Sequence, residues 1–303
     1  MGNLPVCFKR NRMKAFFAII GHPVAHSLSP CFQQAAFNAC EIDAAYIPID
    51  LDPARAEETI PSLKDMGISG FNVTLPFKEL AYRKVDKVFG IASKIRSVNT
   101  VVSRGEQWEG YNTDVPGFVK AYSSFLEKAG KKSGNFVVLG AGGSARAILE
   151  GLSSMNPCHI KVVNRSSERV EALLKEVSRE GSISMNPLSE LNASLEGKSW
   201  HIINTLSRNA FPDRGEFPPL EPVEEARVAS VFDLSYEREG DTECVSWARR
   251  RGIASSDGLS MLLFQGALSF EIWTGKAAPV EKMAEAMAKA LPNRKNLADQ
   301  LSV

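Results

Sequence analysis

The chain has 303 residues, of which 44% are hydrophobic and 23% charged, the composition of an ordinary globular protein long enough for about two domains. Its net charge of +1 gives no reason to expect binding to nucleic acid or to an anionic membrane. The longest apolar stretches, 15–21 and 259–270, are too short to cross a bilayer. Five scattered cysteines without a C-x-x-C pair predict free thiols and a cytoplasmic location.

The first 13 residues carry several basic side chains but no cleavage pattern of small residues. We therefore expect a poorly ordered extension rather than a signal peptide, with Met1 or Met13 as the true start.

Short apolar runs alternate with helical stretches from residue 15 to residue 111, which predicts parallel βαβ units in one α/β domain. Strands are expected over 15–21, 44–51, 97–103 and 107–112.

Serine and proline signals place the helices between these strands. Ser29 is predicted to cap a helix that has Pro30 at its first position. Pro53 is predicted to open a second helix, which Gly67 ends.

The stretch Gly70–Lys78 alternates apolar and polar residues, the pattern of a strand. Pro76 cannot donate to a sheet, so the strand is expected to end there and to leave Thr74 and Lys78 at its mouth. A lysine held beside a hydroxyl can donate or accept a proton. For an isolated lysine the more common explanation is a solvated residue where the next helix opens, expected here near Glu79.

A glycine-rich turn follows the buried strand predicted over 135–140. The turn fits the pattern G-x-G-x-x-A and consists of Gly140, Ala141, Gly142, Gly143, Ser144 and Ala145. Glycines let the backbone approach a pyrophosphate, and the helix that follows offers it free N–H groups. With a second strand at 159–164, the context predicts a dinucleotide site, although a tight turn without ligand is the alternative.

The residues after that second strand indicate which dinucleotide binds. NAD sites usually place an acid there, whereas this chain has Asn164, Arg165 and Ser166, with Arg169 one turn later. An arginine suits a 2′-phosphate, so the cofactor is predicted to be NADP. Simple capping of the next helix by Asn164 and Ser166 is compatible with this role.

Further strands are expected over 201–205 and 229–235, with a helix near 240–251. The helix after Gly258 is apolar on all sides and therefore predicted to be buried. The side-chain amide of Gln265 either forms hydrogen bonds with the backbone or faces a cleft and contacts a polar ligand. The last helix, over 279–291, is amphipathic and is expected to pack on the first domain.

Metal-binding patterns are weak. His22 and His26 flank Pro23 without a second group of ligands, and His159 and His201 lack the spacing of a zinc helix. We predict no metal.

Eight motifs occur in a single order along most of the chain. They are SLSP (27–30), NVTLPFK (72–78), SVNT (97–100), YNTD (111–114), GAGGSAR (140–146), NRS (164–166), FDLSY (232–236) and DGLSMLLFQ (257–265). In these motifs the chain resembles the shikimate/quinate dehydrogenase superfamily, and in particular its shikimate dehydrogenases.

The resemblance implies two α/β domains, namely a substrate-binding domain and an NADP-binding Rossmann domain. The first would comprise 1–114 plus 258–303, because the C-terminal helices would return to it, and the second would comprise 115–257. The active site would lie in the cleft between them.

The resemblance also implies a role for particular residues. Lys78 and Asp114 would form the catalytic pair. Substrate would be bound by Ser27, Ser29, Thr74, Asn99, Tyr236 and Gln265. Gly258 would join the glycine turn in binding the cofactor.

The chain departs from the family pattern at four places. Gln33 stands where a histidine is usual, and Val115-Pro116 replaces a glycine after the YNTD motif. Leu206 and Arg238 also depart from the pattern. These changes affect the expected detail of the cofactor pocket and the preference for shikimate or quinate as substrate. The surroundings of Leu28 and Val115 are expected to decide that preference.

The leading hypothesis is an NADP-dependent enzyme that interconverts 3-dehydroshikimate and shikimate. A quinate/shikimate dehydrogenase of broader specificity and a non-catalytic metabolite-binding regulator are the alternatives. Small molecules are the expected partners of a monomer or homodimer, with no nucleic acid and no membrane.

Overall fold

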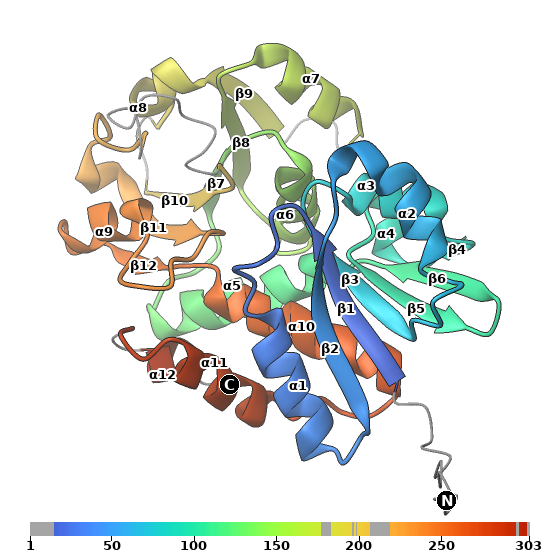
Figure 1. Ribbon diagram of the computed structural model, residues 1–303. Coiled ribbons are helices and arrows are strands. Elements are labelled where there is room, and N and C mark those ends of the chain that lie inside the picture. Colours follow the sequence, from blue (N-terminus) through green and yellow to red (C-terminus); the bar gives the residue numbers. More distant parts are fainter. Residues whose placement is uncertain are drawn as a thin grey trace, which may run out of the picture.

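The computed structural model describes residues 15–176, 183–195, 197, 199–206, 219–294 and 297–301. The predicted N-terminal extension lies outside these residues. Two six-stranded sheets, each with helices packed against it, form two lobes side by side (Figure 1).

The first sheet is mixed rather than parallel. Its order is β2-β1-β3-β5-β6-β4, and its strands are β1 (Ala15–Gly21), β2 (Ala44–Asp50), β3 (Gly70–Val73), β4 (Lys87–Val88), β5 (Thr100–Arg104) and β6 (Gln107–Tyr111). Strand β1 pairs in parallel with β2 and β3, but β5 is antiparallel to both β3 and β6. The prediction of parallel units throughout was wrong here, because only Gly105 and Glu106 join β5 to β6, and so short a link makes a hairpin.

The helices of the first lobe begin at different residues from those predicted. They are α1 (Ser29–Ala39), α2 (Ala56–Ser62), α3 (Lys78–Lys84) and α4 (Ile91–Ile95), with a 3₁₀ turn at Pro53–Arg55. Ser29 is the first residue of α1 and not its cap, since Leu28 already has helical backbone angles. Strand β3 ends at Val73, before Pro76, and Lys78 opens α3.

The second sheet is entirely parallel, in the order β12-β11-β10-β7-β8-β9. Its strands are β7 (Asn135–Leu139), β8 (His159–Asn164), β9 (Ile183–Pro187), β10 (Trp200–Asn204), β11 (Val228–Asp233) and β12 (Ala254–Ser256). Read from β9, this is the doubly wound order 3-2-1-4-5-6 of a dinucleotide-binding sheet. The strands predicted at 135–140, 159–164, 201–205 and 229–235 are confirmed to within a residue or two.

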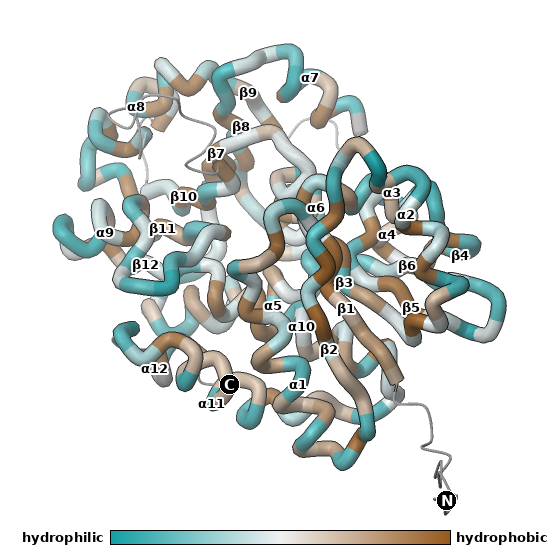
Figure 2. Tube along the Cα trace, viewed as in Figure 1, coloured by the Kyte–Doolittle hydropathy of each residue, from teal (hydrophilic) through white to brown (hydrophobic). Residues whose placement is uncertain are grey.

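Helices on both faces cover the second sheet. They are α5 (Asp114–Lys128), α6 (Gly143–Ser153), α7 (Ser167–Glu176), α8 (Leu191–Ser194) and α9 (Glu243–Arg249), with 3₁₀ turns at Leu188–Glu190 and Glu225–Arg227. Strands β7 and β10 are buried along their whole length. Figure 2 shows the brown, hydrophobic segments mainly on interior strands, whereas the teal, hydrophilic residues lie mainly on outer helices and loops.

The C-terminal helices return to the first lobe, as expected. They are α10 (Leu259–Thr274), α11 (Val280–Ala290) and α12 (Leu297–Leu301). Met283 of α11 and Phe270 of α10 share a buried core with Phe37 of α1. The Trp273 indole also donates to the Val101 carbonyl, at 2.9 Å. The first lobe is therefore built from both ends of the chain.

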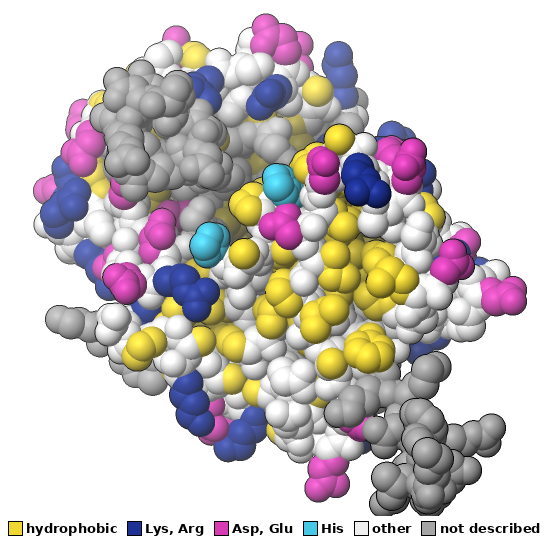
Figure 3. All heavy atoms as spheres, viewed as in Figure 1, with side chains coloured by type: hydrophobic (Ala, Val, Ile, Leu, Met, Phe, Trp, Pro, Cys, Tyr) yellow, Lys and Arg dark blue, Asp and Glu magenta, His cyan; other side chains and the backbone are white. Residues whose placement is uncertain are grey.

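Strand β2 lies at the edge of the first sheet, and hydrophobic side chains gather over β1 and β2 in Figure 3. Gln34 closes part of this edge, because its side-chain Nε2 donates to the Ala44 carbonyl at 3.0 Å and its Oε1 accepts from the Tyr46 N–H at 3.2 Å. Pro48 has no N–H to offer. The edge is thus poorly suited to pairing with another strand.

Candidate active site

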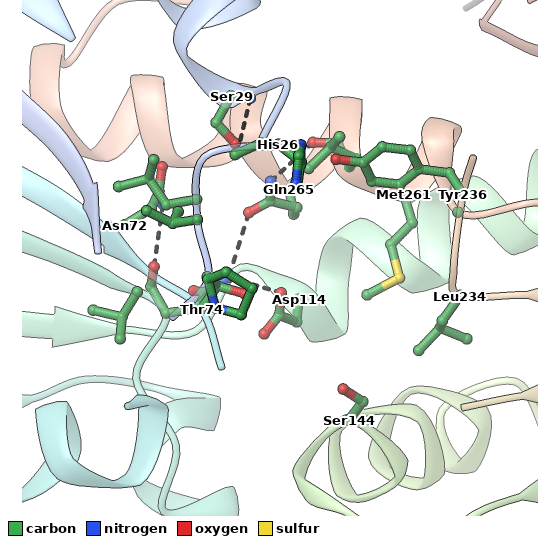
Figure 4. A pocket seen from close by; sticks show the side chains of 18 of the residues that line it. His26, Ser29, Asn72, Thr74, Asp114, Ser144, Leu234, Tyr236, Met261 and Gln265 are labelled. Atoms are coloured by element: carbon green, nitrogen blue, oxygen red, sulfur yellow. Dashed lines mark hydrogen bonds between the residues drawn. The ribbon is translucent and has the colours of Figure 1, made fainter. Parts of the chain in front are cut away.

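A cavity of about 720 Å³ lies between the two lobes. It is bounded by the loop before α1, the end of β3, the loop after β11 and the first turns of α10 (Figure 4). The cavity brings together all eight residues predicted to catalyse or to bind substrate: Ser27, Ser29, Thr74, Lys78, Asn99, Asp114, Tyr236 and Gln265. Two of the predicted cofactor residues, Ser144 and Gly258, line it as well.

Lys78 and Asp114 meet on the wall of this cavity. Each is the first residue of its helix, α3 and α5 respectively, and the lysine Nζ lies 2.8 Å from the carboxylate Oδ2. The two side chains are 21% and 12% exposed. Lys78 does open a helix, as the common explanation holds, but it is a partly buried and paired lysine rather than a solvated one.

Asp114 is held from several sides. The Asn99 amide donates to its Oδ1 at 2.9 Å, and the Asn112 side chain accepts from its backbone N–H at 3.0 Å. The Asn99 side chain is fixed in turn, because its Oδ1 accepts from the Thr113 N–H at 2.7 Å. One carboxylate oxygen therefore faces Lys78 while the other binds an amide that is itself locked in place.

Asn72 is a cavity residue that sequence reasoning missed. Its side-chain oxygen accepts from the Tyr46 hydroxyl at 2.8 Å, and its amide donates to the Ser269 Oγ at 2.9 Å. Burial raises the pKa of Tyr46 well above its usual range, so the phenol stays a hydrogen-bond donor. Asn72 was overlooked because it belongs to an alternating strand in which a polar residue carries no special signal.

Gln265 is satisfied on the backbone and also faces the cavity, and its contact with a polar ligand stays a prediction. Its amide donates to the Leu262 carbonyl of its own helix at 2.9 Å, which is the backbone satisfaction expected of a buried amide. Its Oε1 lies 3.4 Å from both the Asn99 amide and the Thr113 hydroxyl, and the residue lines the cavity.

The two serines lie at the start of α1. The Ser27 Oγ accepts from the Ser29 N–H at 3.2 Å, and the Ser29 side chain is buried at the cavity wall. Together with the positive end of the helix dipole they form a polar corner open to an anion.

The glycine turn fits a pyrophosphate. Gly140 has φ +107°, and a Cβ there would lie 2.5 Å from the Thr205 Oγ1, so only glycine suits this position. A Cβ on Gly142 or Gly143 would meet nothing within 4 Å, which leaves open space over the start of α6. No side chain caps that helix, and Ser144 of its first turn points toward the cavity in Figure 4.

Close packing requires a glycine at position 258. A Cβ there would lie 2.0 Å from the Leu234 carbonyl oxygen, so the chain can enter α10 beside the loop after β11 only with glycine at this point.

The residues predicted for the 2′-phosphate lie at the carboxyl end of β8. The Ser166 Oγ accepts from the Arg169 N–H at 3.3 Å, which is a helix cap for α7, and the Asn164 amide donates to the Ser166 carbonyl. The exposed Arg165 stands beside this turn. Glu168, an acid at this turn, accepts from the Ser166 hydroxyl at 2.7 Å, and this hydrogen bond lowers the pKa of Glu168.

Two of the departures from the family pattern are explained locally. Gln33 is fully buried and donates to the Gly266 carbonyl of α10 at 2.8 Å. Leu206 packs beside Gly140 at the glycine turn. Leu28 and Val115 are buried and do not themselves line the cavity, and the influence of their surroundings on the choice between shikimate and quinate stays a prediction.

Within the described parts of the chain, no three metal-ligating side chains of the His, Cys, Asp or Glu type come together. Among the helices that the structure describes, none is both long and apolar enough to cross a membrane.

Comparison with known proteins agrees with this fold. Residues 19–101 match the shikimate dehydrogenase substrate binding domain, residues 125–249 match shikimate / quinate 5-dehydrogenase, and residues 258–288 match the shikimate 5'-dehydrogenase C-terminal domain. The shikimate dehydrogenase (NADP(+)) of Caldanaerobacter subterraneus subsp. tengcongensis is 36% identical over 86% of this chain and 91% of the relative. That of Methanopyrus kandleri is 35% identical over 90% and 94%.

Solved structures give the same result. The shikimate dehydrogenase of Aquifex aeolicus superposes with a TM-score of 0.79 at 30% identity, covering 91% of this chain and 98% of that chain. The shikimate 5-dehydrogenase of Thermus thermophilus, solved in complex with NADP(H) and shikimate, has a TM-score of 0.75 at 32% identity and covers 91% and 100%. The fold is that of a two-domain, dinucleotide-dependent dehydrogenase. The chain belongs to the shikimate dehydrogenase family.

Proposed function

We propose that this protein is an NADP-dependent shikimate dehydrogenase of the shikimate pathway, which leads to the aromatic amino acids, and that Lys78 and Asp114 are its catalytic pair. The observation that carries the proposal is the 2.8 Å contact between these side chains in a cavity that also reaches the dinucleotide turn at Ser144.

Substrate binding follows from the polar groups around the cavity. Ser27 and Ser29, at the positive end of α1, hold the substrate carboxylate. Ring hydroxyls are held by Thr74, Asn99, Asp114 and Gln265, and Tyr236 lies beside the ring.

The chemistry needs a proton at the carbon–oxygen centre that is oxidised or reduced. NADP, when bound, supplies the hydride acceptor or donor. In oxidation Lys78 accepts the hydroxyl proton, and in reduction it returns a proton to the developing alkoxide. Asp114 keeps the lysine directed at that oxygen, and it stays in place because Asn99 holds its second carboxylate oxygen.

The cofactor site is assigned to the glycine turn and the end of β8. Gly140 to Ala145 and Gly258 would surround the nicotinamide and pyrophosphate parts, and Asn164, Arg165, Ser166 and Arg169 would surround the 2′-phosphate. An arginine and hydroxyl donors favour this anion, whereas the ribose of NAD would need an acid at the same place.

The domain division follows the two sheets. We assign residues 1–114 and 258–303 to the substrate-binding domain and residues 115–257 to the cofactor domain. The protein is further proposed to act in the cytoplasm as a monomer or homodimer.

One assay tests the proposal directly. Oxidation of shikimate and of quinate is followed at 340 nm with NADP and with NAD, in all four combinations. Turnover of shikimate with NADP well above the other three supports the proposal. Comparable rates with quinate would favour the broader dehydrogenase, and no turnover in any combination would favour the regulator.

A further inference from the structure

Arg238 lies in the loop that follows β11 and lines the cavity from the side of the second sheet. Its Nη1 donates to the His26 carbonyl of the opposite lobe, at 3.3 Å. A guanidinium has five N–H donors, so this contact leaves donors for a ligand. The residue is exposed, but it reaches across the cavity to the loop that carries Ser27.

The positive charge of Arg238 acts on side chains at the start of α1. Burial raises the pKa of the Cys31 thiol, in the first turn of that helix, and the charge of Arg238 opposes the rise. The same charge acts on Tyr236, whose pKa is also raised chiefly by burial. The positive charge of the guanidinium therefore acts on the polar corner where Ser27 and Ser29 lie.

The balance of charge around the cavity singles out this residue. Only Lys78 and Arg238 are lysine or arginine among the described lining residues, against the acids Asp114, Glu237 and Glu239. Asp114 neutralises Lys78 at 2.8 Å. No acid among the described residues forms an ion pair with Arg238 within 4.0 Å. An anionic ligand at the serine corner thus meets one cation that is not already neutralised.

We infer that Arg238 is a specificity-determining residue that attracts and hydrogen-bonds the carboxylate of the substrate, with Ser27 and Ser29 as its neutral partners. This inference rests on the proposed function and adds the source of positive charge that two serines cannot supply. Hydroxyl groups position a carboxylate but do not favour its charged form over a neutral analogue, whereas a guanidinium does.

A purely mechanical role is the competing explanation. The contact with the His26 carbonyl joins the two lobes, so Arg238 could act only as a latch that holds the cavity closed. A latch would serve charged and neutral ligands alike, and the two roles therefore separate when the charge of the ligand is removed.

The experiment compares shikimate with its uncharged methyl ester, in the whole protein with saturating NADP. We expect R238A to lower kcat/KM for shikimate by about 5- to 10-fold, mostly through KM. This is less than a buried charge-assisted hydrogen bond would give, because the guanidinium is exposed and screened by solvent. The same variant should change kcat/KM for the ester by less than about twofold, and R238K should keep part of the effect for the acid.

A matched control lies one residue away. E239Q removes a negative charge from the same exposed loop, so it should raise kcat/KM for shikimate slightly and leave the ester unchanged. Equal losses for acid and ester in R238A, or a fall in kcat with KM unchanged, would overturn the inference in favour of a latch. If the unaltered protein does not oxidise shikimate at all, the proposed function itself has failed, which is a separate result.

Discussion

Replacement of Lys78 by alanine is the most direct test of the catalytic pair. The substitution removes the ammonium that lies 2.8 Å from the Asp114 carboxylate and leaves no described lysine or arginine lining the cavity except Arg238. Loss of a positioned acid–base group costs about 10²–10⁴ in rate, which corresponds to about 2.7–5.5 kcal/mol of barrier. We expect kcat to fall by this factor while KM for shikimate stays nearly unchanged.

The fold should survive the change. Asp114 keeps the hydrogen bond from Asn99 at 2.9 Å and the contact of its N–H with Asn112. The carboxylate left without its lysine should therefore cost at most about 1–3 kcal/mol of unfolding free energy, measurable by urea denaturation.

The same helix offers a control. Lys84, the last residue of α3, forms an ion pair with Glu57 at 2.7 Å on the surface, and K84A should alter neither kcat nor stability by much, since such pairs contribute about 0–1 kcal/mol. Steady-state oxidation of shikimate is compared for the three proteins at saturating NADP. If folded K78A retained kcat within about tenfold of the unaltered protein, the acid–base role of Lys78 would be refuted.

Three further substitutions probe other parts of the molecule. R165A should weaken NADP by about 1.5–3 kcal/mol, as expected for a charged hydrogen bond, and leave NAD nearly unchanged in fluorescence titrations; equal losses for both would mean a structural arginine. G142V should abolish cofactor binding in the same titration, because its side chain would fill the open space above the start of α6, with unchanged circular dichroism as the check on folding. His201 is buried and bonded to Ser230 at 2.8 Å, and desolvation lowers its pKa. In the unfolded chain His201 takes up a proton at a higher pH than in the folded protein. The free energy of unfolding should therefore fall as the pH drops from about 7 toward 5. H201N should flatten this dependence in urea unfolding, and an unchanged slope would show that other groups cause it.

The dinucleotide half of the fold was the easier half to predict. Its four central strands, β7, β8, β10 and β11, are short and largely buried runs. Its glycine turn follows a local rule, because Gly140 has a positive φ and a Cβ there would clash with Thr205. The parallel order follows because neighbouring strands are joined by long connections, most of which contain a helix. None of this requires knowledge of distant contacts.

The first lobe was predicted less well. The hairpin of β5 and β6 breaks the parallel pattern, and β4 is too short to leave a periodic signal. The helix at Ser29 begins one residue earlier than capping preference suggests, because the Leu28 backbone is already helical. Local propensity competes here with the packing of α1 against α11 and α10, which the sequence pattern does not display.

By itself, the sequence determined which residue types were available for chemistry: an alternating stretch ending in Lys78, a glycine turn, an arginine after β8 and the motifs that place the chain in its family. Only the tertiary structure decided that Lys78 is paired rather than solvated, since its partner Asp114 is 36 residues away. Only the tertiary structure also shows that Asn72 lines the cavity and forms hydrogen bonds with Tyr46 and Ser269. A side chain's environment is set by the elements folded against it, and these come from distant parts of the chain.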